Sequence, residues 1–125
     1  RQESVLLQGA YDPLIPYFSR MQVQQLVLEY ATERPGSVAV LGDLPADKEI
    51  GLGVCNPRSA EIESVDFIVG KVKALLQHRR PDQIYLNPDC GFGTFAERPV
   101  NTTDVATQKL QIIHQAAEVL RAEYA

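Results

Sequence analysis

Three short apolar segments, separated by amphipathic helical stretches, constrain the fold of this chain more than any other feature. They cover residues 23–29, 49–56 and 83–87, and the second and third each end at a proline. Strands that alternate with helices form parallel sheets, because each helix carries the chain back across the sheet in a right-handed crossover. The sequence therefore predicts an α/β fold.

The helix between the second and third strands has the clearest local signals. Ser64 is a suitable N-cap, Asp66 favours the positive end of the helix dipole, and Arg79 and Arg80 would suit its last turn. Apolar residues recur with the i, i+3, i+4 spacing of one buried face. They are Val65, Ile68, Val69, Val72, Leu75 and Leu76.

Two further helices and the chain length bear on the architecture. Helices are expected from about residue 104 to 124 and over 13–21, while the apolar run 38–41 fits either a helix or a strand. A (β/α)₈ barrel needs about 250 residues. Pattern alone therefore leaves two architectures open for these 125 residues, half of such a barrel or a small open sheet. Because the chain begins with Arg1, we expect it to be part of something longer.

Composition argues against several classes of protein. Twelve Lys and Arg against sixteen Asp and Glu give a net charge of -4, whereas nucleic-acid binding needs clustered basic residues. No apolar run approaches the ~18–20 residues of a membrane span. Two cysteines are too few for a disulfide framework. The first residues of the sequence do not have the pattern of a signal peptide. We therefore expect a cytoplasmic protein that binds neither nucleic acid nor membranes.

Residues capable of chemistry stand where the predicted strands end, which is where parallel α/β folds place their working side chains. Glu29 ends the first strand, and the segment 87–90 with Cys90 follows the third. Zinc accepts both cysteine sulfur and carboxylate oxygen. Two ligands do not make a site, however, and no H-x-C, C-x-x-C or H-E-x-x-H motif is present. The residues alone favour the simpler interpretation, in which Glu29 pairs with Arg34.

The cysteines and two glycines allow further expectations. Cys55 lies inside an apolar strand and is expected to be a small buried hydrophobe, whereas Cys90 lies among turn residues. Gly51 and Gly53 stand two residues apart in a strand that glycine weakens. One explanation is that they keep one face of the strand clear for a ligand or for a backbone segment that passes close by. The other is that they line a tightly packed barrel interior. His78 is expected to be a solvated residue near a helix C-terminus, and His114 a structural residue in the last helix.

Two motifs resemble a known family. The segments Glu49-Ile-Gly-Leu-Gly-Val54 and Asn87-Pro-Asp-Cys-Gly-Phe-Gly-Thr-Phe95 are similar to the catalytic barrel of cobalamin-independent methionine synthase, and most closely to its compact relatives. The resemblance runs from Leu7 to the last helix. It implies the C-terminal three βα units of a (β/α)₈ TIM-type barrel, with residues 1–125 forming one part of that barrel and an upstream half lying outside them.

The resemblance also implies a zinc site. In that family zinc is held by a His-x-Cys pair, by a Glu at a strand end, and by the Cys of Asn-Pro-Asp-Cys-Gly. The last two correspond to Glu29 and Cys90, and the neighbouring Asn87 and Asp89 are candidates for orienting the ligand through hydrogen bonds. The His-x-Cys pair has no counterpart in residues 1–125. It is expected just before Arg1, unless this relative has lost zinc.

The implied activity is that of a 5-methyltetrahydropteroyltriglutamate–homocysteine S-methyltransferase. Such an enzyme moves a methyl group from a methyltetrahydrofolate-type donor to the thiol of homocysteine and yields methionine. Two alternatives stay open. One is another zinc thiol alkyltransferase or a corrinoid methyltransferase of the same superfamily. The other is an inactive fragment that self-associates, because three βα units leave strand edges and an apolar inner face exposed.

Overall fold

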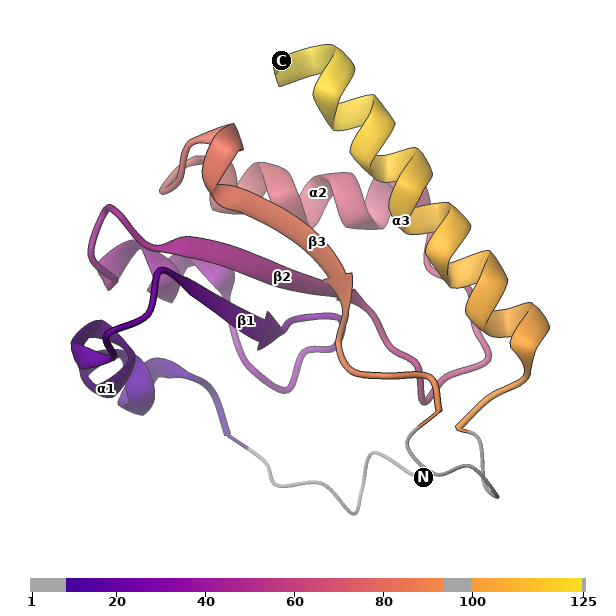
Figure 1. Cartoon of the computed structure of the whole chain (residues 1–125), viewed down its shortest axis with the longest axis horizontal. Coiled ribbons are helices and arrows are strands. Elements are labelled where there is room, and N and C mark those ends of the chain that lie inside the picture. Colours follow the sequence, from indigo (N-terminus) through magenta and orange to yellow (C-terminus); the bar gives the residue numbers. More distant parts are fainter. Residues whose placement is uncertain (1–8, 94–99, 125) are drawn as a thin grey trace.

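The computed structural model describes residues 9–93 and 100–124 and contains one parallel sheet. Its strands are β1 (Gln25–Glu29), β2 (Glu49–Cys55) and β3 (Ile84–Pro88), in the spatial order β1-β2-β3. Figure 1 shows the three arrows pointing the same way, so that their carboxyl ends meet at one edge. The predicted α/β class is confirmed, and each strand lies within two residues of its predicted bounds.

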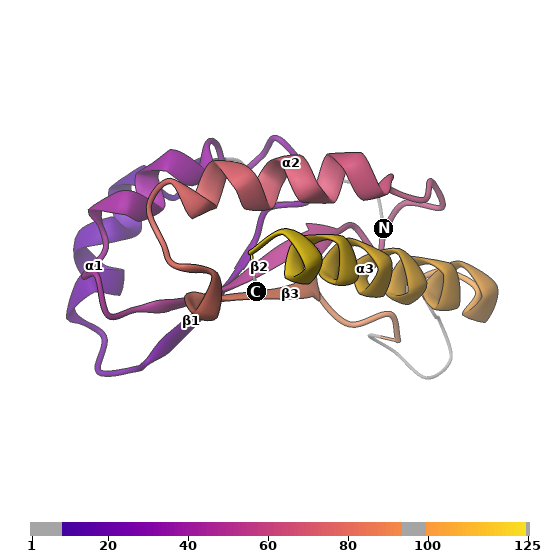
Figure 2. The same cartoon turned by 90° about the horizontal axis from the view of Figure 1, so that it is seen from above.

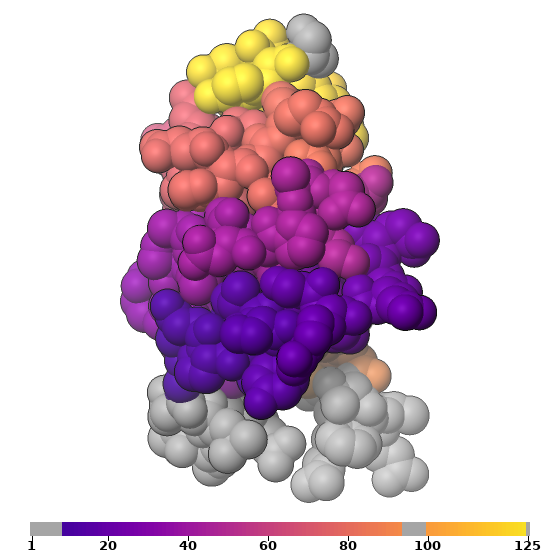
Figure 3. Space-filling view, turned by 90° about the vertical axis from the view of Figure 1, so that its left-hand side faces the viewer, coloured from indigo at the N-terminus to yellow at the C-terminus, as the bar shows by residue number. Residues whose placement is uncertain are grey.

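Helices connect the strands. A 3₁₀ turn, η2 (Asp12–Leu14), leads into α1 (Ile15–Arg20), and the run that fitted either helix or strand is a second 3₁₀ helix, η3 (Val38–Asp43). The crossover between β2 and β3 contains α2 (Val65–Leu76) and the short η4 (Pro81–Gln83), and α3 (Thr103–Tyr124) follows β3. Figure 2 shows α2 lying over one face of the sheet. In Figure 3 the segments are stacked in chain order, from indigo to yellow.

The start of α2 agrees with the prediction and its end does not. The Ser64 hydroxyl accepts a hydrogen bond from the Phe67 N–H (3.0 Å), as an N-cap should. The helix stops at Leu76, so the expectation that Arg79 and Arg80 occupy its last turn is wrong. Arg79 is instead buried and donates to three backbone carbonyls of the turn 41–45 at 3.0–3.1 Å. A buried guanidinium needs several acceptors, and the carbonyls of Leu41, Leu44 and Pro45 supply three.

The two faces of the sheet differ in character. Alternate residues point toward the helices and form the buried core, which includes Leu26, Leu28, Ile50, Leu52 and Val54. The opposite face carries Val27, Gly51 and Tyr85 in register across the three strands. Val27 is 63% exposed and Tyr85 is 49% exposed. No helix in the described part of the chain is long and apolar enough to span a membrane.

Candidate functional site

The register of the sheet brings polar residues together at its carboxyl edge. Glu29 of β1 and Asn87 of β3 both pair with Gly53 of β2, one on each side. Asp89 and Cys90 follow directly after β3, and Arg58 follows β2. Residues from all three strand ends therefore lie at the edge of the sheet that contains Gly53, in the region where the sequence predicted the working residues.

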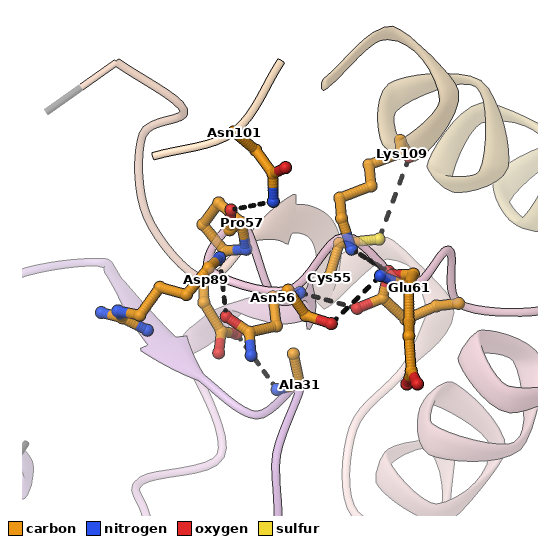
Figure 4. Close-up of polar contacts among 11 residues, drawn as sticks. Ala31, Cys55, Asn56, Pro57, Glu61, Asp89, Asn101 and Lys109 are labelled. Carbon is orange, nitrogen blue, oxygen red and sulfur yellow. Dashed lines mark hydrogen bonds and ion pairs between the residues drawn. The ribbon is translucent and has the colours of Figure 1, made fainter. Parts of the chain in front are cut away.

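Asp89 connects the ends of β1 and β3 across β2. Its carboxylate Oδ1 accepts hydrogen bonds from the backbone N–H groups of Tyr30 and Ala31, both at 3.1 Å, and the side chain is nearly buried. The Asp89 N–H in turn donates to the Cys55 carbonyl (2.8 Å). Figure 4 shows Asp89 and Ala31 within this cluster of polar contacts. Asp89 thereby fixes the backbone immediately after Glu29.

The absence of a side chain at Gly53 leaves room for the Asp89 side chain to cross over β2. A Cβ atom at Gly53 would lie 2.3 Å from Asp89 Oδ1 and 2.8 Å from the Leu28 carbonyl oxygen. At Gly51 the nearest atoms, Asn87 Oδ1 and Val27 Cγ2, would both be at 3.0 Å. The sequence left open whether the two glycines keep a face clear or fill a packed barrel interior. At Gly53 the first explanation holds, because the Asp89 carboxylate and the Leu28 carbonyl approach its Cα closely.

Burial and two charged neighbours, Glu29 and Arg58, together determine the pKa of Asp89. Desolvation by burial raises the pKa of Asp89 to about 6, and the Ala31 N–H opposes that rise. The negative charge of Glu29 raises the same pKa further, while the Arg58 guanidinium lowers it. The Asp89 carboxylate is therefore influenced by both members of the Glu29–Arg58 ion pair.

Glu29 is held by two arginines. Arg34 Nη2 donates a hydrogen bond to Glu29 Oε2 within an ion pair, and Arg58 Nη2 lies 3.7 Å from Glu29 Oε1. The predicted pairing of Glu29 with Arg34 is confirmed. The backbone N–H of Glu29 also donates to the Tyr11 hydroxyl (3.1 Å). All three charged side chains are at least 70% buried, which strengthens their attraction.

Sequence reasoning missed two members of this site. Arg58 comes three residues after the end of β2, so the strand-end argument that selected Glu29 could have found it. Tyr11 lies before η2, and no local pattern links it to Glu29. Burial is the main cause that raises the pKa of the Tyr11 hydroxyl. That hydroxyl therefore stays protonated at neutral pH while it accepts the Glu29 N–H.

The predicted cysteine and amide residues lie in different environments. Cys55 is completely buried, as expected, and its sulfur lies 3.9 Å from the Lys109 carbonyl of α3. Desolvation raises the pKa of the Cys55 thiol to about 12, so the thiol is neutral. Cys90 is half-buried and adjoins Asp89. The Asn87 amide donates to the neighbouring Pro88 carbonyl (2.9 Å), at the end of β3.

A metal centre would need more donors than this region offers. Among residues 9–93 and 100–124, no three His, Cys, Asp or Glu side chains are grouped so that they could hold a metal ion. The donor types of Glu29 and Cys90 suit zinc, and both residues stand at the carboxyl edge of the sheet. A complete zinc site would therefore take its remaining donors from outside the described residues.

Comparisons with known proteins agree with this arrangement. Residues 8–119 match the family described as cobalamin-independent synthase, catalytic domain. Methionine synthases of Pyrococcus horikoshii and Saccharolobus islandicus are 33% and 25% identical over 113 and 115 residues. These alignments cover 90% and 92% of this chain but only 31% and 33% of the relatives, so the chain spans about a third of their length.

A solved structure shows the same fold. The B12-independent methionine synthase from Shewanella sp. W3-18-1, in complex with selenomethionine, aligns with a TM-score of 0.77 at 18% identity. The alignment covers 90% of this chain and 31% of that one, which is a TIM-barrel enzyme. The barrel prediction is thus confirmed for this segment. With a family match over most of its length, the chain belongs to the catalytic-domain family of the cobalamin-independent synthases.

Proposed function

We propose that residues 1–125 form the C-terminal part of the catalytic barrel of a zinc-dependent methyltransferase. The whole protein would transfer a methyl group from a methyltetrahydrofolate-type donor to the thiol of homocysteine. The observation that supports this proposal is the register that sets Glu29 of β1 and Asn87 of β3 on either side of Gly53 at the carboxyl edge of the sheet, in a chain of this family. Family membership favours homocysteine as the acceptor over the thiols of other alkyltransferases.

The chemistry needs a sulfur nucleophile at neutral pH, and free thiols ionise only near pH 8.5. A zinc ion bound at this edge would supply a coordinated thiolate. The sulfur would attack the methyl carbon, forming an S–C bond while the C–N bond to the donor breaks and the nitrogen keeps the electron pair. In this proposal Glu29 and Cys90 are donors to the metal. Asp89 fixes the backbone beside Glu29 through its bonds to the Tyr30 and Ala31 N–H groups.

Residues 1–125 alone would lack part of this machinery. Catalytic zinc is held by three protein ligands or more, and we propose that the ligands missing here come from outside this stretch. The isolated chain should therefore bind zinc weakly and should not turn over. It should also self-associate, because Val27 and Tyr85 leave an apolar sheet face exposed and β1 and β3 are the outer strands of the described sheet. Zinc titration and light scattering of residues 1–125 test both expectations.

The decisive experiment measures the zinc content and methyl transfer of the complete gene product. Cys90→Ala and Glu29→Gln should lose most of the bound zinc and the activity. The matched control is Cys55→Ala, which removes a buried thiol with no place in the proposed site and should retain zinc. Zinc loss in Cys55→Ala but not in Cys90→Ala would overturn the ligand assignment. A zinc-loaded protein that methylates homocysteine only from a corrinoid donor would favour the alternative methyltransferase.

A further inference from the structure

A buried lysine of α3 joins that helix to the loop that follows β2. Lys109 is completely buried, and its Nζ donates to the Glu61 carbonyl (2.6 Å) and to Glu63 Oε1 (2.7 Å). The other carboxylate oxygen of Glu63 accepts the Asn56 N–H (2.8 Å). Figure 4 shows Lys109 extending from α3 toward Glu61 and Asn56. Lys109 therefore holds one end of the loop 56–63 directly and the other end through Glu63.

Two more hydrogen bonds shape the middle of the same loop. The Asn56 side-chain oxygen accepts the Arg58 N–H (3.0 Å), and the Asn101 amide donates to the Pro57 carbonyl (3.2 Å). A loop whose backbone is bonded at this many points has few conformations left. The Arg58 side chain is only 14% exposed, and its guanidinium faces the Glu29 carboxylate at the end of β1.

Stability alone explains little about this buried ion pair. Withdrawing two charges from water is unfavourable, and replacing such a pair with apolar side chains of similar volume often leaves a protein as stable as before. The helix already packs on the core through Ala116 and Leu120. Among the described residues, the Lys109 ammonium donates its hydrogen bonds to the loop. These directional bonds select one loop conformation, which apolar packing would not do.

We infer that Lys109 is a positioning residue, which keeps the loop 56–63 in the conformation that the substrate needs. The inference rests on the proposed function. The loop begins at the carboxyl edge of the sheet, where parallel α/β enzymes bind their ligands. Arg58 reaches from this loop to the neighbouring strand end at Glu29. Lys109 itself is buried beneath α3 and acts on the edge of the sheet through the loop.

Releasing the loop should weaken substrate binding more than it slows the reaction. A mobile loop has the binding conformation only part of the time, and the apparent affinity falls by that fraction. Once the substrate is bound, the loop is ordered again and the bound complex reacts as before. A loop that is correctly placed about one-tenth of the time would raise the KM for homocysteine about tenfold. The kcat should stay within about threefold of wild type.

The test compares Lys109→Met/Glu63→Gln with the wild-type complete gene product. Replacing both residues avoids leaving a buried charge without its partner, and an amide oxygen at position 63 can still accept the Asn56 N–H. Hydrogen exchange followed by mass spectrometry measures the opening of the backbone over residues 57–62 and needs no substrate. Steady-state kinetics with homocysteine separate KM from kcat.

Leu120→Ala is the matched control for a loss of stability. Leu120 lies eleven residues, or roughly 16 Å, further along α3 and packs in the apolar core. Its truncation destabilises the helix packing without removing a hydrogen bond of the loop. We expect the loop amides to exchange about tenfold faster in the double variant and within about twofold of wild type in Leu120→Ala. The KM for homocysteine should rise in the double variant alone.

Several results would overturn the inference. They are unchanged loop exchange in Lys109→Met/Glu63→Gln, an equal acceleration in Leu120→Ala, and a kcat that falls at unchanged KM. An active wild-type protein whose double variant has an open loop but an unchanged KM refutes this inference alone. A wild-type protein that does not methylate homocysteine refutes the proposed function, and hydrogen exchange then decides separately whether Lys109 holds the loop.

Discussion

Replacing Gly53 with Ala probes the crossing of the Asp89 carboxylate over β2. Gly53 has no positive φ angle, since Gly9 and Gly36 are the glycines with that conformation among the described residues. The backbone at Gly53 therefore accepts alanine, and any cost must come from contacts. The added Cβ would lie 2.3 Å from Asp89 Oδ1, 2.8 Å from the Leu28 carbonyl oxygen and 3.1 Å from the Glu29 Cα.

The expected cost follows from what must move. The Asp89 side chain has to retreat, which breaks its hydrogen bonds to the Tyr30 and Ala31 N–H groups. Each bond to a charged group contributes about 1.5–3 kcal/mol. Restricting the unfolded chain with alanine returns about 0.4–1 kcal/mol. Because the Tyr30 N–H also donates to the Gly53 carbonyl (3.1 Å), its loss of Asp89 is partly compensated. We expect Gly53→Ala to lower the free energy of unfolding by about 2–5 kcal/mol, which is a large part of the ~5–15 kcal/mol of a typical domain.

Urea denaturation followed by circular dichroism measures this change, with two glycine variants as controls. In Gly51→Ala the added Cβ would lie 3.0 Å from the ends of two side chains. This substitution should lower the free energy of unfolding by less than about 1 kcal/mol. Gly70→Ala, in α2 with nothing within 4 Å, should raise stability by about 0.5–1 kcal/mol. In an Asp89→Ala background, the destabilisation caused by Gly53→Ala should be smaller by about 2 kcal/mol or more. Two results would refute the claim that the Asp89 side chain crosses β2 over Gly53. One is that Gly53→Ala destabilises no more than Gly51→Ala, and the other is that its effect is unchanged in the Asp89→Ala background.

Two further predictions concern the buried cluster beneath α3. Lys109→Met should lower the free energy of unfolding by about 3 kcal/mol, because the Glu63 charge loses its buried partner. The double variant Lys109→Met/Glu63→Gln should recover part of that loss in the same denaturation assay, and no recovery would count against the pair. Cys55 should resist alkylation by iodoacetamide at pH 8 in the native protein, since its pKa of about 12 leaves about one thiol in ten thousand ionised. Mass spectrometry should find it labelled only after unfolding, and rapid native labelling would show that Cys55 is accessible.

The sequence by itself determined the features that depend on residues close together in the chain. Strand positions followed from short apolar runs, and the N-cap at Ser64 followed from its place before an amphipathic stretch. The pairing of Glu29 with Arg34 was also predictable, because five residues separate them. Family motifs added the candidate ligands Glu29 and Cys90, whose metal role stays a prediction.

The tertiary structure decided the contacts that join distant segments. Asp89 reaches Tyr30 across 59 residues, and Lys109 reaches Glu63 across 46. Periodicity shows which face of an element is buried, but the residue that the face meets depends on how the crossovers pack. The role of Arg79 changed for that reason: the helix ended early, and the freed guanidinium found the carbonyls of a turn more than thirty residues away. Arg58 likewise owes its place beside Glu29 to a loop that α3 holds from the far end of the chain.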